Sequence, residues 1–194
     1  MTKLDRGTIV NEALALLDEL GLDAVSTRQL AKRLGVEQPS LYYHFRNKAS
    51  LLQAMAEAAM AGHAAAPLPE PSDDWPGWLA ENSRSFRQAL LAHRDGARLH
   101  AGTAPQGADL SRALRKLEFL VSAGLPEHDA RIAMLTTGHF TVGSVLEEQA
   151  DAAEGQVDGP GLDRTEAFEA GLALIIDGAA RRAGHLADTR SRDS

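Results

Sequence analysis

Apolar residues near the start of the chain recur at intervals of three or four, and glycines interrupt them. This spacing is typical of one face of an amphipathic helix, and a glycine directly after the last apolar position is typical of a helix C-cap. We therefore expect a helix that ends at Gly21. Its apolar positions are Ile9, Ala13, Leu16, Leu17 and Leu20.

Two shorter helices are predicted next. Ser26 or Thr27 can cap a helix over 28–34, which Gly35 ends. Pro39 follows at a position where the first turn of another helix needs no backbone N–H. A supporting helix followed by two short helices across a glycine-containing turn is the helix-turn-helix arrangement, whose second helix enters the major groove of DNA.

The rest of the chain is also predicted to be helical, and aromatic residues at 5% argue against an all-β fold. Ser72, Asp73 or Asp74 can cap the helix that starts near Trp75. The predicted elements are a helix from 48 to about 63, a break at Pro67, Pro69 and Pro71, a helix over 75–91, a short segment over 96–103, and helices over 110–120, 127–152 and 168–179. We therefore expect an all-α protein.

Three segments are expected along the chain. They are a helix-turn-helix DNA-binding domain over 1–47, a linker helix over 48–66, and an effector-binding and dimerisation domain over 67–194. The last two long helices carry more apolar surface than one layer of neighbours covers, which favours a four-helix-bundle interface between two copies. Burial within one chain is the alternative. The apolar positions are Ile132, Leu135, His139, Val142, Val145 and Leu146 on one helix and Phe168, Leu172, Ile175, Ile176 and Ala179 on the other.

Charge is distributed unevenly although the net charge is −7. Residues 1–48 carry +1, the remaining residues carry −8, and 24–48 hold five basic residues against one acidic residue. A locally basic segment suits a nucleic-acid partner. The chain has no cysteine, which excludes disulfides, thiolate zinc sites and a cysteine nucleophile. We find no apolar run of about 18 residues and no leader peptide, so we expect a soluble cytoplasmic protein without a membrane partner.

The side chains of the basic segment suit base and phosphate contacts. Arg28 can bind guanine through two hydrogen bonds, Gln38 can bind adenine in the same way, and Pro39 can contact a thymine methyl group. An alternative for Tyr42 and Tyr43 is that they are core residues of a small helical unit. The candidate DNA-binding residues are Thr27, Arg28, Gln38, Pro39, Ser40, Tyr42, Tyr43, His44 and Lys48, with Asn47 as a further phosphate-contact type.

The stretch STRQLAKRLGVEQPSLYYHFRNKASLL (26–52) resembles the DNA-binding head of the TetR family of bacterial repressors. Two further stretches, NSRSFRQALLAHRDGARLHAGT (82–103) and HFTVGSVLEEQ (139–149), resemble the effector-binding core of the tetracycline repressors within that family. The resemblance implies a homodimer on a palindromic double-stranded operator and a small-molecule effector. It also implies no obligatory cofactor, with Mg²⁺ bound only as part of a drug chelate.

The resemblance assigns residues to this effector site. His100 would be the Mg²⁺ ligand. Waters on the metal would be held by Thr103 of the same subunit and by Glu147 of the partner subunit. A magnesium ion that keeps several waters and takes oxygens from its ligand fits a single imidazole. The other positions implied are Asn82 and Phe86 against the drug, Lys116 at a drug-binding position, and Pro105 and His139 in the wall.

Three departures from the family pattern affect the choice of ligand. Ala64 replaces a drug-binding histidine, Ala104 an arginine, and Lys116 a glutamine. The lost hydrogen bond at 64 costs roughly 1–3 kcal/mol where it is buried. A lysine at 116 repels Mg²⁺ or attracts an anion. A related chelating polyketide or a ligand with a carboxylate therefore fits at least as well as tetracycline.

The sequence argues against two other functional classes. The seven histidines could serve a metal-dependent enzyme, but the chain has no His-x-x-x-His pair on a helix face, no glycine-rich phosphate loop and no nucleophile elbow. The acidic residues after position 48 repel free DNA, which argues against a DNA-binding protein that works without ligand control. We expect a ligand-released transcriptional repressor rather than an enzyme.

Overall fold

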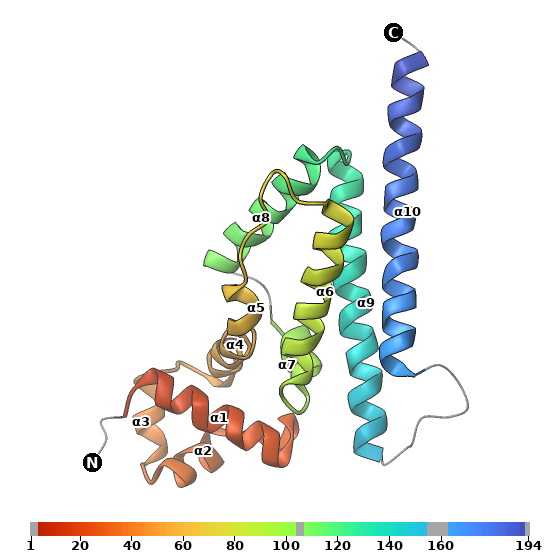
Figure 1. Ribbon diagram of the computed structural model, residues 1–194. Helices are drawn as coiled ribbons and strands as arrows, with labels where there is room; N and C mark the ends of the chain where they lie inside the picture. The colour runs from red at the N-terminus through yellow and green to blue at the C-terminus, as the bar shows by residue number, and fades with distance from the viewer. Residues whose placement is uncertain (1–3, 104–106, 155–162, 193–194) are drawn as a thin grey trace. The chain divides into compact units, whose positions relative to one another are not determined.

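The computed structural model describes residues 4–103, 107–154 and 163–192, and these form helices and no strand, which confirms the all-α prediction (Figure 1). Contacts divide the chain into two compact units. We call Met1–Ala65 with Gln88–Ala104 the head unit, and Ala66–Arg87 with Pro105–Ser194 the body unit. The head unit thus includes the segment after residue 88, which the sequence assigned to the body. The separate roles of the three predicted segments stay a prediction.

The helices of the head unit begin and end at recognisable caps. Ser26 is the N-cap of α2, since its hydroxyl accepts from the backbone N–H of Gln29, and Gly35 ends that helix with a positive φ of 65°. Asn47 and Ser50 form a capping box at the start of α4. The elements are α1 (Arg6–Leu20), η1 (Leu22–Ala24), α2 (Thr27–Leu34), α3 (Gln38–Tyr42), α4 (Lys48–Ala59), α5 (Ala61–Ala65) and α7 (Gly96–Ala101).

One apolar core joins the helices of the head unit. It contains Leu30 of α2, Leu41 of α3, Met55 of α4 and, from much later in the chain, Leu99 of α7. Each of these four side chains is at most 2% exposed. The short helix α7 is therefore fixed to the same core that supports the helix-turn-helix. The predicted linker helix from 48 to about 63 is divided at Met60 into α4 and α5.

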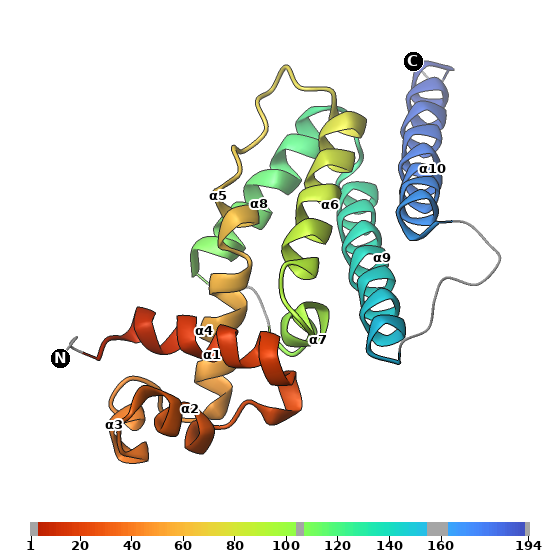
Figure 2. The ribbon, with the colours of Figure 1, turned by 60° about the horizontal axis from the view of Figure 1, so that its bottom comes forward.

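The body unit contains α6 (Trp75–Leu91) up to Arg87, together with α8 (Gly107–Ser122), α9 (Glu127–Glu154) and α10 (Arg164–Arg192) (Figures 1 and 2). Helices α9 and α10 pack side by side, and α8 packs on α9. Trp78 and Phe119 meet edge to face, with their ring centroids 5.1 Å apart. Across the described parts of the chain, no helix is long and apolar enough to cross a membrane.

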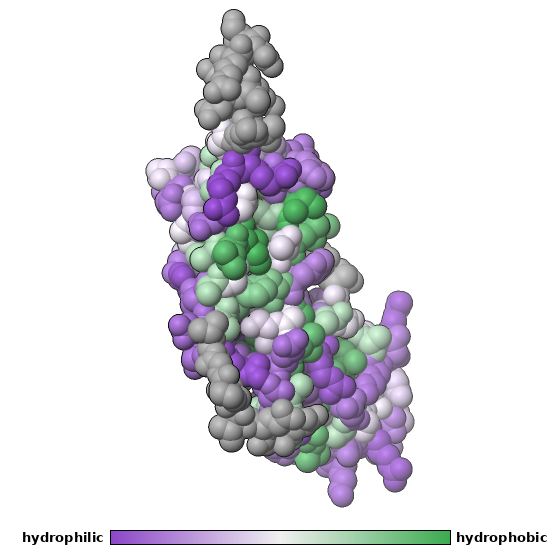
Figure 3. All heavy atoms as spheres, turned by 90° about the vertical axis from the view of Figure 1, so that its right-hand side faces the viewer, coloured by the Kyte–Doolittle hydropathy of each residue, from purple (hydrophilic) through white to green (hydrophobic). Residues whose placement is uncertain are grey.

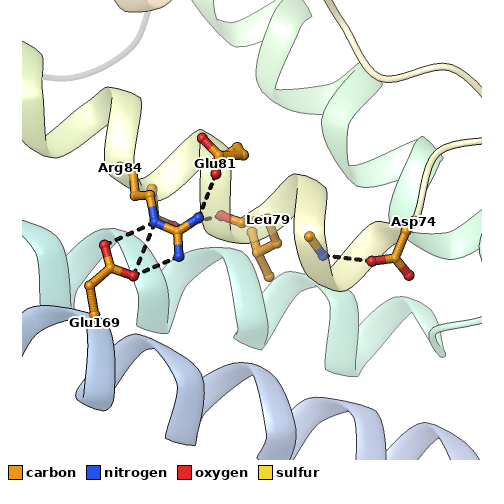
Figure 4. Close-up of polar contacts among 7 residues, drawn as sticks. Asp74, Leu79, Glu81, Arg84 and Glu169 are labelled. Carbon is orange, nitrogen blue, oxygen red and sulfur yellow. Dashed lines mark hydrogen bonds and ion pairs between the residues drawn. The ribbon is translucent and has the colours of Figure 1, made fainter.

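Polar contacts fix α6 within the body unit (Figure 4). Asp74 accepts from the backbone N–H of Gly77 at 3.0 Å, so it is the residue that caps α6. The guanidinium of Arg84 donates to the carboxylate of Glu169 on α10 through Nε at 2.9 Å and Nη2 at 2.6 Å, and it also contacts Glu81. A two-pronged arginine–carboxylate contact fixes the relative orientation of two helices better than a single hydrogen bond does.

The apolar stripe predicted for the dimer interface is partly buried inside one chain. Phe168, Leu172 and Ile176 pack against α6 and α9, and Phe168 stacks on Phe140 with ring centroids 5.5 Å apart. That part of the expectation was wrong, because α10 is apolar on more than one side. The large apolar residues of α9 and α10 that remain at least 47% exposed are Ile132, Leu135 and Leu174. Figure 3 shows apolar side chains gathered on the side of the body unit where α10 lies.

Candidate DNA-binding face and ligand pocket

Helix α3 and the residues after it turn two large apolar side chains to the core and both tyrosines to solvent. Leu41 and Phe45 are buried at 2% and 4% exposure, whereas Tyr42 is 49% and Tyr43 is 91% exposed. The alternative that Tyr42 and Tyr43 are core residues is therefore wrong. The other predicted DNA-binding residues are all at least partly exposed, namely Thr27, Arg28, Gln38, Pro39, Ser40, His44 and Lys48.

A hydrogen-bond network holds Gln38 in place. Its Nε2 donates to Thr27 Oγ1 at 2.8 Å and to Tyr42 Oη at 3.3 Å. These two bonds use both hydrogens of the amide nitrogen. A bidentate contact to adenine needs one hydrogen of Nε2 as well as Oε1, so the predicted base contact would require Gln38 to give up one of these bonds.

Arg6 is a residue of this face that the sequence reasoning missed. Its Nη1 donates to the backbone oxygen of His44 at 3.0 Å, and its guanidinium lies 4.4 Å from the ring centroid of Phe45. Arg6 thus supports the turn between α3 and α4. The sequence could have indicated a role for Arg6, because a positive charge in the first turn of a helix interacts unfavourably with the helix dipole. A contact outside the helix compensates for this. Arg33, in contrast, is engaged by Glu12 and Glu19.

The junction between α6 and α7 is anchored to the end of α1. Asp95 has a positive φ of 56°, and its Oδ2 accepts from the backbone N–H of Leu22 at 2.8 Å. Asp18 accepts from the backbone N–H of Arg94 at 3.0 Å, and Arg98 pairs with Asp23 at 3.1 Å. Residues about 75 positions apart are thereby joined, so α7 and the supporting helix of the head are held together.

His100 lies at the end of α7, within the head unit. Burial lowers its pKa below the usual value, which keeps the imidazole in the neutral form that binds metal ions. Thr103 donates from its hydroxyl to the backbone oxygen of His100 at 2.8 Å. No group of three or more histidine, aspartate and glutamate residues that could hold a metal occurs in 4–103, 107–154 and 163–192. Pro105 and Ala104 lie outside the described residues.

Asn82 and Phe86 border a small pocket in the body unit, of about 40 Å³. This is room for a few water molecules. Lys116 of α8 does not line this pocket itself, but its Nζ donates to Oδ1 of the lining residue Asn82 at 2.6 Å. The other lining residues are Trp78, Leu79, Ser83, Met134, Thr137 and Gly138.

The predicted site residues on α9 lie elsewhere. His139 and Glu147 are exposed, and neither lines this pocket. Within the body unit the structure therefore brings Asn82 and Phe86 to one pocket and Lys116 into contact with Asn82, and within the head unit it brings His100 and Thr103 together. The roles of all these residues in ligand binding stay predictions.

Two family descriptions match the chain. Residues 9–55 match "Bacterial regulatory proteins, tetR family", and residues 67–161 match "Tetracyclin repressor-like, C-terminal domain". The class A tetracycline repressor protein from transposon 1721 of Escherichia coli is 46% identical over 94% of this chain and 93% of its own length.

Solved structures agree with this relationship. A TetR-family transcriptional regulator from Streptomyces coelicolor is 62% identical, with a TM-score of 0.73 over 92% of this chain and 99% of that one. A class A TetR in complex with 5a,6-anhydrotetracycline and magnesium is 48% identical, with a TM-score of 0.81 over 92% and 99%. The chain therefore belongs to the tetR family of bacterial regulatory proteins, and it is a ligand-responsive, DNA-binding transcriptional repressor.

Proposed function

We propose that this protein is a cytoplasmic homodimer that occupies a palindromic operator and leaves it when a small molecule binds. The observation that carries this proposal is the position of α7. Leu99 shares one core with the helices of the head, and the neighbouring His100 is the predicted ligand contact. A ligand that moves α7 therefore acts directly on the packing of the DNA-binding helices. Ligand and operator would then favour different conformations of the same protein.

In this proposal the segment 1–47 binds DNA, and the segment 67–194 binds the effector and the second copy of the chain. The segment 48–66 is the linker between these two. Arg28, Gln38 and Pro39 contact base edges in the major groove. The remaining exposed polar residues of the head position the protein on the phosphates. They are Thr27, Ser40, Tyr42, Tyr43, His44 and Lys48, and Arg6 supports the turn that carries His44.

The homodimer rests on the exposed apolar face of the body unit. Ile132 and Leu135 of α9 and Leu174 of α10 are 47%, 55% and 70% exposed. Large apolar side chains gathered on one face mark a surface that associates. A two-fold contact through this face forms the four-helix bundle and gives two heads for the two half-sites of a palindrome.

A tetracycline–Mg²⁺ chelate is the first ligand to test. The related class A TetR was solved with anhydrotetracycline and magnesium. The drug would contact Asn82, Phe86, Pro105 and His139 of one subunit. Its Mg²⁺ ion would be bound by His100 of that subunit, with waters held by Thr103 and by Glu147 of the partner subunit. A second candidate is a pocket adapted to another ligand, because the amide oxygen of Asn82 is already bound by Lys116.

The test is a fluorescence titration of tetracycline into the purified dimer, with Mg²⁺ and again with EDTA. Saturable, Mg²⁺-dependent binding that is lost in His100→Ala is the expected result for the chelate. A second titration follows release from an operator selected from a random duplex library. Failure to select any duplex would overturn the DNA-binding proposal, and binding of tetracycline without release would overturn the proposed response.

A further inference from the structure

Lys116 places a positive charge inside the body unit. It lies on α8 and is partly buried, and its Nζ is 2.6 Å from Asn82 Oδ1 on α6. Burial, together with the charge of Arg112, lowers the pKa of Lys116 to about 8, and the charge of Asp109 partly opposes this shift. The ammonium group is thus still mostly charged at pH 7, although its surroundings disfavour the charge.

One acceptor of this ammonium group is a neutral amide oxygen, that of Asn82. A hydrogen bond in which both groups are charged is shorter and about twice as strong as one between neutral groups. A carboxylate in the position of the Asn82 oxygen would therefore be a better partner for Lys116 than the amide is. The bond to Lys116 uses only the oxygen of the Asn82 amide, so its nitrogen can donate to the same ligand.

Arg112 adds a second positive charge on the same side of α8, one helical turn before Lys116. It is also partly buried, and its Nη2 donates to the backbone oxygen of Ala66 at 2.5 Å. Two cations that are four residues apart on a helix repel each other, and an anion near both relieves that repulsion.

The wall beside Asn82 has a different chemistry. Trp78, Phe86 and Met134 supply aromatic and thioether surface, and the polar groups of Ser83 and Thr137 are occupied by backbone oxygens of their own helices. An apolar ligand body suits such a wall. Because the cavity itself has room for only a few waters, a larger ligand must separate Lys116 from Asn82 as it enters.

We propose that the effector of this protein is an aromatic carboxylic acid, whose carboxylate takes the place of Asn82 Oδ1 as the acceptor of Lys116 and whose ring system lies against Trp78 and Phe86. Arg112 contributes a second positive charge. This inference rests on the proposed ligand-responsive function and names the chemical class of the ligand. It also explains why a lysine stands at a position where the family pattern has a glutamine.

The probes are three acid–amide pairs, namely naphthalene-2-, anthracene-2- and anthraquinone-2-carboxylic acid, each with its own carboxamide. Binding to the full-length protein is measured by calorimetry and by quenching of tryptophan fluorescence. Both tryptophans, Trp75 and Trp78, lie on α6. At least one acid is expected to bind at least tenfold more tightly than its amide, which has nearly the same shape without the charge.

Two variants locate the effect. Lys116→Gln is expected to weaken the acid at least tenfold and to remove the difference between acid and amide. Arg115→Gln is the matched control, since it removes a positive charge from the exposed side of the same helix and is expected to keep the difference. Circular dichroism checks that both variants remain helical.

Three outcomes would overturn the inference. They are equal binding of acid and amide, an acid preference that persists in Lys116→Gln, and no binding of any acid by protein that still binds its selected operator. The last result leaves the DNA-binding function intact. If Lys116 only tethers α8 to α6, Lys116→Gln would lower the unfolding temperature and leave any acid preference unchanged. Failure to bind an operator would instead count against the proposed function.

Discussion

The residues of the head that contact bases and those that contact phosphates should respond differently to substitution. We predict that Arg28→Ala weakens binding to the selected operator by about 1–3 kcal/mol and relaxes the preference at one guanine. Lys48→Ala should weaken operator and random duplex alike, because phosphates are the same in every sequence. Fluorescence anisotropy with both duplexes measures the two effects.

The control for these variants is Arg131→Ala. Arg131 is exposed on α9 and pairs with Glu127 one turn earlier, so its loss should leave both affinities unchanged. Equal losses on operator and random duplex for Arg28→Ala would contradict its assignment as a base contact.

Lys116 should make the stability of the unliganded protein depend on pH. Its pKa is lowered from the ordinary 10.5 to about 8 in the folded state, so between these values the unfolded chain binds the additional proton. Stability must then rise with pH across this window and be lowest below pH 8. We predict that wild type gains more stability than Lys116→Gln between pH 7 and pH 9.5 in urea unfolding. Parallel pH profiles would show that burial does not affect this lysine.

Gly96 is required where the chain enters α7. A Cβ atom at this position would lie 2.1 Å from the backbone oxygen of Leu90, so the backbone itself would have to move. We predict that Gly96→Ala destabilises the protein by about 1–3 kcal/mol, the usual cost of overpacking. Thermal unfolding measures the change.

Gly62→Ala is the matched control for this prediction. No atom lies within 4 Å of a Cβ at Gly62, and alanine is the better helix former. Its stability should be unchanged or higher by up to about 1 kcal/mol. If both variants were equally stable, the contact between α7 and the end of α6 would not be as tight as described.

The ends of the helices in the head could be predicted from sequence because they depend on local chemistry. Gly21, Ser26, Gly35 and Pro39 each satisfy or omit a backbone hydrogen bond of a neighbouring turn, and the structure has each of them at a helix end. The division of the linker helix at Met60 is not marked by a glycine or proline at the break itself, since the nearest glycine, Gly62, lies within α5.

Contacts between distant helices could not be predicted in the same way. Periodicity showed that α10 is apolar but not which side packs inside, so Phe168 and Leu172 were expected at an interface between copies and are buried within one. The bond between Lys116 and Asn82 joins residues 34 positions apart, and only the packing of α8 and α6 brings them together. The sequence could indicate that Lys116 needs a polar partner, but not which one.

At the scale of the whole molecule, the exposed apolar face should decide the oligomeric state. Leu174→Glu puts a charge at a position that is 70% exposed in one chain and buried in the proposed dimer. We predict a shift from dimer to monomer in sedimentation experiments and a loss of tight operator binding, because one head can occupy only one half-site. Val121→Glu, at an apolar position on α8 that is 38% exposed, should leave the dimer intact. A Leu174→Glu protein that stays dimeric would exclude α10 from the interface.

Ligand and operator must also affect each other equally. If the effector lowers operator affinity by some factor, the operator must lower effector affinity by the same factor, because both paths connect the same four states. We predict this reciprocity for an acid that releases the operator, and a factor of 100 would correspond to a coupling of about 2.7 kcal/mol. The measurement is one titration of the acid into free protein and another into the protein–operator complex. An acid that binds both equally could not release the protein from DNA, so such a result would assign the site beside Lys116 to something other than regulation.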